Sequence, residues 1–67
     1  MKSITFKPIR NKFGNLAFQD STMSVLGEIA FHQLDAVILE HHKLSVETYF
    51  QIQRSLMFDQ EITVEKN

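Results

Sequence analysis

Residues 21–58 read STMSVLGEIAFHQLDAVILEHHKLSVETYFQIQRSLMF, and this stretch decides the fold. Apolar residues recur along it every three or four positions, which is the period of an amphipathic helix. The pattern breaks at residues 42–45, HKLS, and then starts again. We therefore expect two consecutive helices joined by a tight connection, with short strands built around the pair.

The second helix has the better-marked start. Ser45 is its expected N-cap, because a serine side-chain oxygen accepts hydrogen bonds from the free amides of the first turn. Glu47 follows within that turn, where a carboxylate interacts favourably with the helix dipole. Leu44 and Tyr49 have the spacing of a hydrophobic staple. The expected apolar stripe of this helix comprises Val46, Tyr49, Phe50, Leu56 and Met57, with Ile52 beside it.

The first helix has several candidate starts. Asp20, Ser21 and Thr22 can each act as an N-cap. Gly27 indicates a later start as the alternative, because glycine costs about 0.5–1 kcal/mol inside a helix relative to alanine. The expected apolar face of this helix comprises Met23, Leu26, Ala30, Phe31, Leu34, Val37 and Ile38.

A histidine doublet ends the first helix. His41 is expected on its apolar face and His42 on its polar face. A protonated imidazole at a helix C-terminus gains about 0.3–1 kcal/mol from the helix dipole, so capping is the expected role. A pH-sensitive packing contact at His41 and a metal ion shared with a second protomer are the alternatives.

Strand periodicity precedes the helix pair. Ile4 and Phe6 alternate with polar neighbours, which is the pattern of a half-buried strand. Pro8 lacks an amide donor, so this strand is expected to lie at a sheet edge or to end there. With turn chemistry in residues 11–15, NKFGN, the simplest structure for residues 4–19 is a β-hairpin.

Alternation returns at the end of the chain, and a final strand there is expected to pair with the first one. The fold prediction is a single α+β domain of order ββααβ. Its parts are a basic strand region (1–20), a helix pair (21–58) and a short strand (61–65), within one domain of residues 1–67.

Composition limits the class of protein. Without cysteine, the 67 residues cannot form a disulfide or a thiolate metal site. A core of this size supplies about 3–5 kcal/mol, so good packing or self-association has to stabilise the fold. The first ten residues, MKSITFKPIR, lack the apolar core expected of a secretory signal, and the longest apolar run, residues 36–39, is far shorter than the roughly 20 residues of a membrane span. We expect a cytoplasmic protein without a membrane partner.

Charge is unevenly distributed. The first twenty residues carry four basic and one acidic side chain, and the remainder carries three basic and seven acidic ones. This asymmetry is consistent with a basic arm that meets phosphate. Attraction between two ends of one surface, or head-to-tail pairing of two protomers, explains it equally well.

The sequence offers few candidate catalytic or metal-binding residues. Glu28, His32 and Asp35 have helical spacing i, i+4 and i+7, and such groups can share a divalent cation. A solvated helix face with ordinary charge pairs is the simpler interpretation. The sequence has no cysteine nucleophile, no glycine-rich phosphate loop and no G-x-S-x-G motif. We expect neither a cofactor nor enzymatic activity.

The function prediction depends on surplus apolar surface. The first helix has more apolar residues than one face can bury, and leftover apolar surface usually marks an interface. We expect a non-enzymatic regulatory or adaptor protein that binds protein as a homodimer, through Phe31, Ile38 and Leu39.

The alternative function is DNA binding, as in a repressor or an antitoxin. Two helices joined by a short break resemble a helix-turn-helix in outline, and a strand followed by two helices resembles the ribbon-helix-helix pattern. In these arrangements the residues that would contact nucleic acid are Lys2, Lys7, Arg10, Lys12 and Arg54.

Overall fold

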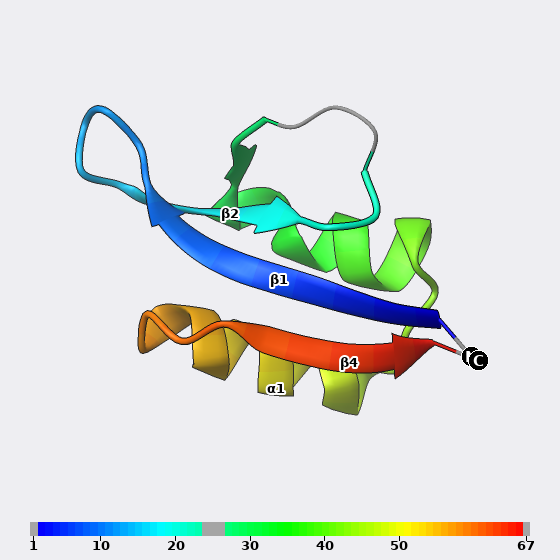
Figure 1. The fold of residues 1–67 in the computed structure, drawn as a ribbon. Helices are drawn as coiled ribbons and strands as arrows, with labels where there is room; N and C mark the ends of the chain where they lie inside the picture. Colours follow the sequence, from blue (N-terminus) through cyan, green and yellow to red (C-terminus); the bar gives the residue numbers. More distant parts are fainter. Residues whose placement is uncertain (1, 24–26, 67) are drawn as a thin grey trace.

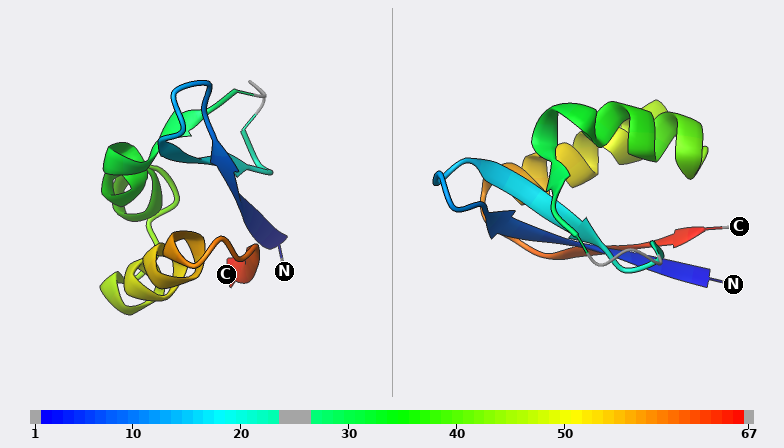
Figure 2. Two further views of the ribbon diagram at one scale, coloured as in Figure 1. Left: turned by 90° about the vertical axis from the view of Figure 1, so that its left-hand side faces the viewer. Right: turned by 90° about the horizontal axis from the view of Figure 1, so that it is seen from above.

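The computed structural model describes residues 2–23 and 27–66. Its elements are β1 (Lys2–Arg10), β2 (Leu16–Asp20), β3 (Ile29–Ala30), η1 (Phe31–Gln33), η2 (Ala36–His41), α1 (Val46–Met57) and β4 (Ile62–Lys66). The four strands form one antiparallel sheet of order β3-β2-β1-β4 (Figure 1). Both helical segments lie on the same face of this sheet (Figure 2). The fold is therefore a two-layer α+β domain.

The strands confirm the predicted hairpin and the predicted final strand. In β1 and β2, Arg10 pairs with Leu16, and the turn between them is closed by Asn11. The Asn11 side-chain oxygen accepts hydrogen bonds from the amides of Phe13 and Asn15, both at 2.9 Å. The final strand pairs with β1 as expected, from Phe6 opposite Ile62 to Lys2 opposite Lys66.

The prediction that Pro8 lies at a sheet edge or ends its strand is wrong, because β1 is an inner strand and continues to Arg10. The backbone of Thr5 faces β2, since its carbonyl accepts from the Ser21 amide at 3.0 Å. Backbone groups alternate along a strand, so the nitrogen of Pro8 faces the β4 side. On that side, the pairing of β1 with β4 ends at Phe6. Pro8 therefore has no pairing partner on β4, and its lack of an amide donor costs the sheet no backbone hydrogen bond.

The predicted start of the first helix is also wrong. Asp20 is the last residue of β2, and it caps a turn by accepting from the amide and the hydroxyl of Thr22 at 2.9 and 2.8 Å. The residues of β3 pair with β2, with Ala17 opposite Ala30. Helical structure begins only at Phe31, so the later of the two expected starts was nearer. Leu26, expected on the helix face, lies outside the described residues.

The first helix changes its hydrogen-bond pattern along its length, from a 3-10 turn to a π-type helix, and it ends in a sharp turn. η1 is a tight 3-10 turn, and η2 is a π-type helix in which the His42 amide donates to the Val37 carbonyl at 2.9 Å. Lys43 has φ 56, and the Leu44 amide then donates back to the Ile38 carbonyl at 2.9 Å. A left-handed residue at this position is a common way to end a helix and satisfy its last carbonyls.

The core lies between the sheet and the helical layer. Phe6 and Phe18 stand on the covered face of the sheet with their ring centroids 6.1 Å apart. Ile52 and Leu56, four positions apart on α1, are packed over β1 and β4. Among the described residues, the largest fully buried side chains are Ile4, Phe6, Phe18, Leu34, Ile38, Ile52 and Leu56. Of the stripe expected from the sequence, Leu56 is buried and Tyr49 packs against the core, but Val46, Phe50 and Met57 are exposed, and Ile52 takes their place in the core.

Candidate protein-binding surface

α1 begins where the sequence predicts. The Ser45 hydroxyl accepts a hydrogen bond from the Thr48 amide at 3.1 Å, which makes Ser45 the N-cap. Glu47 lies in the first turn, as expected. Leu44 and Tyr49 both pack against the core, as a staple at this helix start requires. Local chemistry therefore fixes the position of α1 along the chain.

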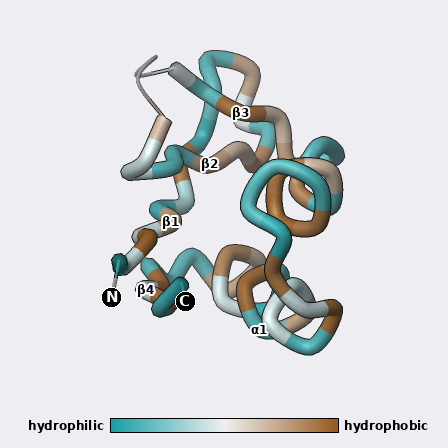
Figure 3. The backbone as a smooth tube through the Cα atoms, turned by 90° about the vertical axis from the view of Figure 1, so that its right-hand side faces the viewer, coloured by the Kyte–Doolittle hydropathy of each residue, from teal (hydrophilic) through white to brown (hydrophobic). Residues whose placement is uncertain are grey.

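The outer side of α1 is apolar. Val46, Phe50 and Met57 are at positions i, i+4 and i+11, which bring them to one side of the helix. They are 56%, 57% and 59% exposed, and Phe58, which follows the helix, is 70% exposed. Figure 3 shows hydrophobic backbone segments on the side of α1 turned away from the strands. We call Val46, Phe50, Met57 and Phe58 the α1 patch.

Charged residues flank this patch. Glu47 and Arg54 are both exposed and seven positions apart, so they lie on the same flank of α1, two turns from each other. Neither of them takes part in an ion pair within the described residues.

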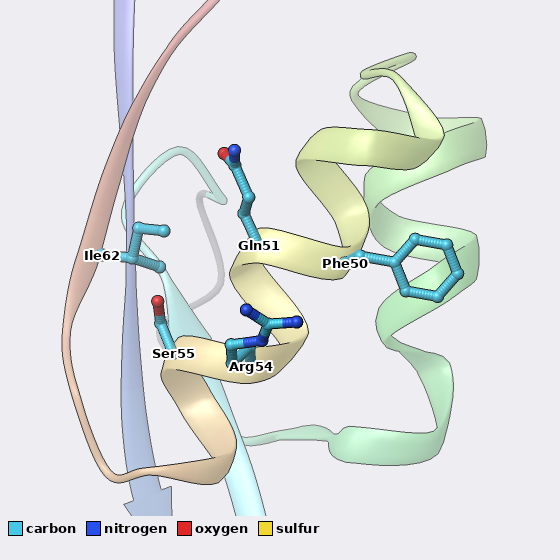
Figure 4. Close-up of a pocket in the computed structure, with 5 residues that line it drawn as sticks. All are labelled: Phe50, Gln51, Arg54, Ser55 and Ile62. Carbon is cyan, nitrogen blue, oxygen red and sulfur yellow. The ribbon is translucent and has the colours of Figure 1, made fainter.

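Cavities lie on both sides of residues 50–57 of α1. One of about 310 Å³ lies along the patch and is lined by Phe50, Gln53, Arg54, Met57 and Phe58. The other, of about 370 Å³, reaches β4 and is lined by Phe50, Gln51, Arg54, Ser55 and Ile62. In Figure 4 the Phe50 ring extends from the side of α1 opposite to Gln51 and Ile62. The patch and the β4 side of α1 are therefore two surfaces that meet at Phe50 and Arg54.

The residues predicted for the protein contact lie elsewhere. Ile38 is fully buried, so this residue cannot reach a partner without unfolding of the core. Phe31 and Leu39 are half-buried and pack against the same core. Val46, Phe50 and Met57 were expected in the packed stripe of the helix, because periodicity alone does not say which part of a wide apolar arc faces the sheet.

The weak metal candidates do not share one helix face, because Glu28 precedes β3 and is not helical. His32 lies in η1, and the Asp35 carboxylate accepts from the Ala36 amide at 2.8 Å. All three are exposed. Within residues 2–23 and 27–66, no three His, Asp or Glu side chains come close enough together to hold a metal ion.

Within the described residues, the buried polar side chains are Asp20 and His42, which form a pair, and this pair reverses the expectation for the histidine doublet. His42 is buried and His41 is exposed. The His42 Nε2 lies 2.5 Å from the Asp20 carboxylate, and the His42 ring packs edge-on against Phe6 at 5.8 Å between centroids. Burial alone would raise the pKa of Asp20, but hydrogen bonds from His42 and Thr22 outweigh it and hold that pKa below 3.8.

The basic residues expected to contact DNA do not form a single surface. Lys2 and Lys7 stand on opposite faces of β1, because their positions differ by an odd number. Arg10 donates two hydrogen bonds of 3.1 Å to Asp59. Lys12 lies over the Phe13 ring at 5.1 Å, in the β1–β2 turn, and Arg54 belongs to the helical layer. DNA binding stays a prediction, which a mobility-shift titration at low salt tests because phosphate contacts weaken steeply with salt.

Comparison with protein-family models, curated proteins and solved structures finds no match for this chain. Across the part of the chain that the structure describes, no helix has the length and apolar character needed to cross a membrane.

Proposed function

We propose that this chain is a small regulatory or adaptor domain that binds protein, and that it forms a homodimer through the α1 patch. The observation that supports the proposal is the exposure of Val46, Phe50 and Met57 on one side of a helix whose other side packs on the sheet. Exposed apolar side chains gathered on one side of a helix, here with Gln53 among them, are typical of a binding site on so small a domain.

The charges beside the patch favour a second copy of the chain as its occupant. When two copies of α1 pack antiparallel about a two-fold axis, the same flank of each helix faces the other. Glu47 of one copy then lies near Arg54 of the second copy, and the contact occurs twice. This complementarity favours the antiparallel orientation, because a parallel two-fold pair places the two flanks on opposite sides of the interface and forms neither contact.

The interface is small, because α1 has 12 residues and is therefore about 18 Å long. A contact built on this helix falls near the lower end of specific interfaces, at about 1,200 Å² in total. We expect a dissociation constant on the order of micromolar, so that dilution separates the two copies.

Sedimentation equilibrium over a range of concentrations tests the proposal. The mass of the wild-type protein should rise from that of one chain toward that of two. Phe50→Asp should remain a monomer throughout, because it places a charge in the centre of the patch. Phe13→Asp is the matched control: Phe13 is 75% exposed in the β1–β2 turn, outside the patch, and its variant should dimerise normally. A folded Phe50→Asp variant that dimerises like the wild type would overturn the proposal.

A further inference from the structure

β4 has an open outer edge. β1 pairs with one side of it, and no described strand pairs with the other. Since the Thr5 backbone faces β2, the alternation along antiparallel strands turns Ile4 toward β4 and Val64 toward β1. The amides and carbonyls of Thr63 and Glu65 consequently point outward. A peptide in extended conformation can bind such an edge as an additional strand.

Cavities line the helix side of this edge. The cavity of about 370 Å³ brings Gln51 and Ser55 of α1 next to Ile62, at the start of β4 (Figure 4). A second cavity, of about 460 Å³, lies at the end of the strand against Thr48 and Lys66. An added strand could therefore place alternate side chains between α1 and β4, which is how such grooves select their peptides.

The opposite face of the edge is acidic. The Thr63 and Thr5 hydroxyls lie 2.9 Å apart on the uncovered face of the sheet, and Glu65, two positions along, shares that face. Glu61 directly precedes Ile62, the first residue of β4, and continuing the alternation of the strand by one residue puts it on the same face as Thr63 and Glu65. Glu61 and Glu65 are both exposed, and neither forms an ion pair within the described part of the chain. The open edge thus presents two negative charges four positions apart.

These two carboxylates determine whether this edge pairs with β4 of a second copy or with a basic peptide. If β4 of a second copy paired antiparallel about Thr63, Glu61 of each copy would stand opposite Glu65 of the other. Like charges directly opposite each other destabilise a strand pair, and charged side chains on an edge are a known protection against self-pairing. A strand with two basic side chains at the same spacing would instead form two favourable cross-strand pairs.

We infer that the outer edge of β4, with the groove between β4 and α1, binds an extended peptide that carries two basic residues four positions apart. The peptide adds as a fifth antiparallel strand. Its basic side chains stand opposite Glu61 and Glu65 on the uncovered face, and its apolar side chains enter the groove beside Ile62. This interaction uses the β4 side of α1, whereas the α1 patch lies on its outer side, and Phe50 borders both.

An NMR titration with synthetic peptides tests this inference. The probe is an acetylated and amidated peptide TKVTVKT, and its matched control is TEVTVET. The probe should shift the amide signals of residues 61–66 and of Gln51 and Ser55, and it should bind on the order of tenfold tighter than the control. In the Glu61→Lys, Glu65→Lys double variant, whose changes are exposed, the preference should reverse.

A second pair of peptides tests the backbone contact. Methylation of the central threonine nitrogen, which would face β4, should abolish binding. Methylation of the preceding valine nitrogen, which would point away from β4, should leave binding within about threefold of the unmodified peptide. Equal binding of the basic and acidic peptides, equal effects of the two methylations, or signal shifts confined to residues outside β4 and α1 would each overturn the inference.

Discussion

The Asp20 carboxylate and the His42 imidazole meet at 2.5 Å although 22 positions separate them in the chain. Asp20 ends β2, and His42 follows the last turn of η2. The pair therefore ties the sheet to the helical layer through two buried polar groups.

Replacement of His42 should be strongly destabilising. In His42→Ala the Asp20 carboxylate would remain buried without its partner, and loss of one member of a buried pair typically costs about 3–5 kcal/mol. That is comparable to the whole stability of a domain this small. Urea unfolding followed by circular dichroism measures the effect. The control is His41→Ala, at the exposed neighbouring position, which should change the unfolding free energy by no more than about 0.5 kcal/mol.

Acid should weaken the same contact. Because the pKa of Asp20 lies below its ordinary value of 3.8 in the folded protein, the ionised carboxylate adds stability above that value. This contribution is lost as the pH falls from about 4 through the folded-state pKa. The difference in unfolding free energy between pH 7 and pH 3 should therefore shrink in Asp20→Asn. Asp59→Asn, which removes an exposed carboxylate paired with Arg10, should retain the wild-type difference; a wild-type pH dependence in Asp20→Asn would contradict the assignment.

Charge reversal on α1 should report the orientation of the proposed dimer. Glu47→Arg alone should weaken dimerisation, and so should Arg54→Glu, because each places like charges opposite each other. The combination of both changes should restore it, since every contact is again between opposite charges. Sedimentation equilibrium of the three variants forms a double-mutant cycle. Additive losses in the double variant would exclude the antiparallel arrangement, because two helical turns separate these residues within one chain.

The turn after η2 offers a stabilising change. Lys43 has φ 56, a conformation that glycine adopts without the steric cost that other residues incur. Lys43→Gly should raise the unfolding free energy by about 0.5–1 kcal/mol. Lys43→Ala, which removes the same charge but keeps the Cβ, should not. Equal stabilities of the two variants would mean that the backbone is not strained at this position.

Local chemistry explains what could be predicted from the sequence. The Ser45 cap, the Asn11 turn and the alternation of Ile4 with Phe6 depend on residues within a few positions of each other, and all three are present in the structure. The final strand was predictable as well, because its apolar alternation matches that of β1.

The features of the structure that the sequence did not predict depend on contacts between residues that are far apart in the chain. Asp20 looks like a helix cap until His42 supplies a buried partner, and the two are far apart in sequence. Ala30 has helical spacing with Leu34 and Val37, yet it pairs with Ala17 of β2. The side of α1 that meets the sheet is likewise set by β1 and β4, so the α1 patch became visible only in three dimensions.

Because Lys2 pairs with Lys66, the order of the elements along the chain can be changed by circular permutation. The first and last strands bring both ends of the domain to one corner (Figure 1). A linker of a few residues could join them, and new termini could be opened in the exposed turn at Phe13 and Gly14. Such a circular permutant would keep every strand pair of the sheet, and the original domain could equally be inserted into a surface loop of a host protein.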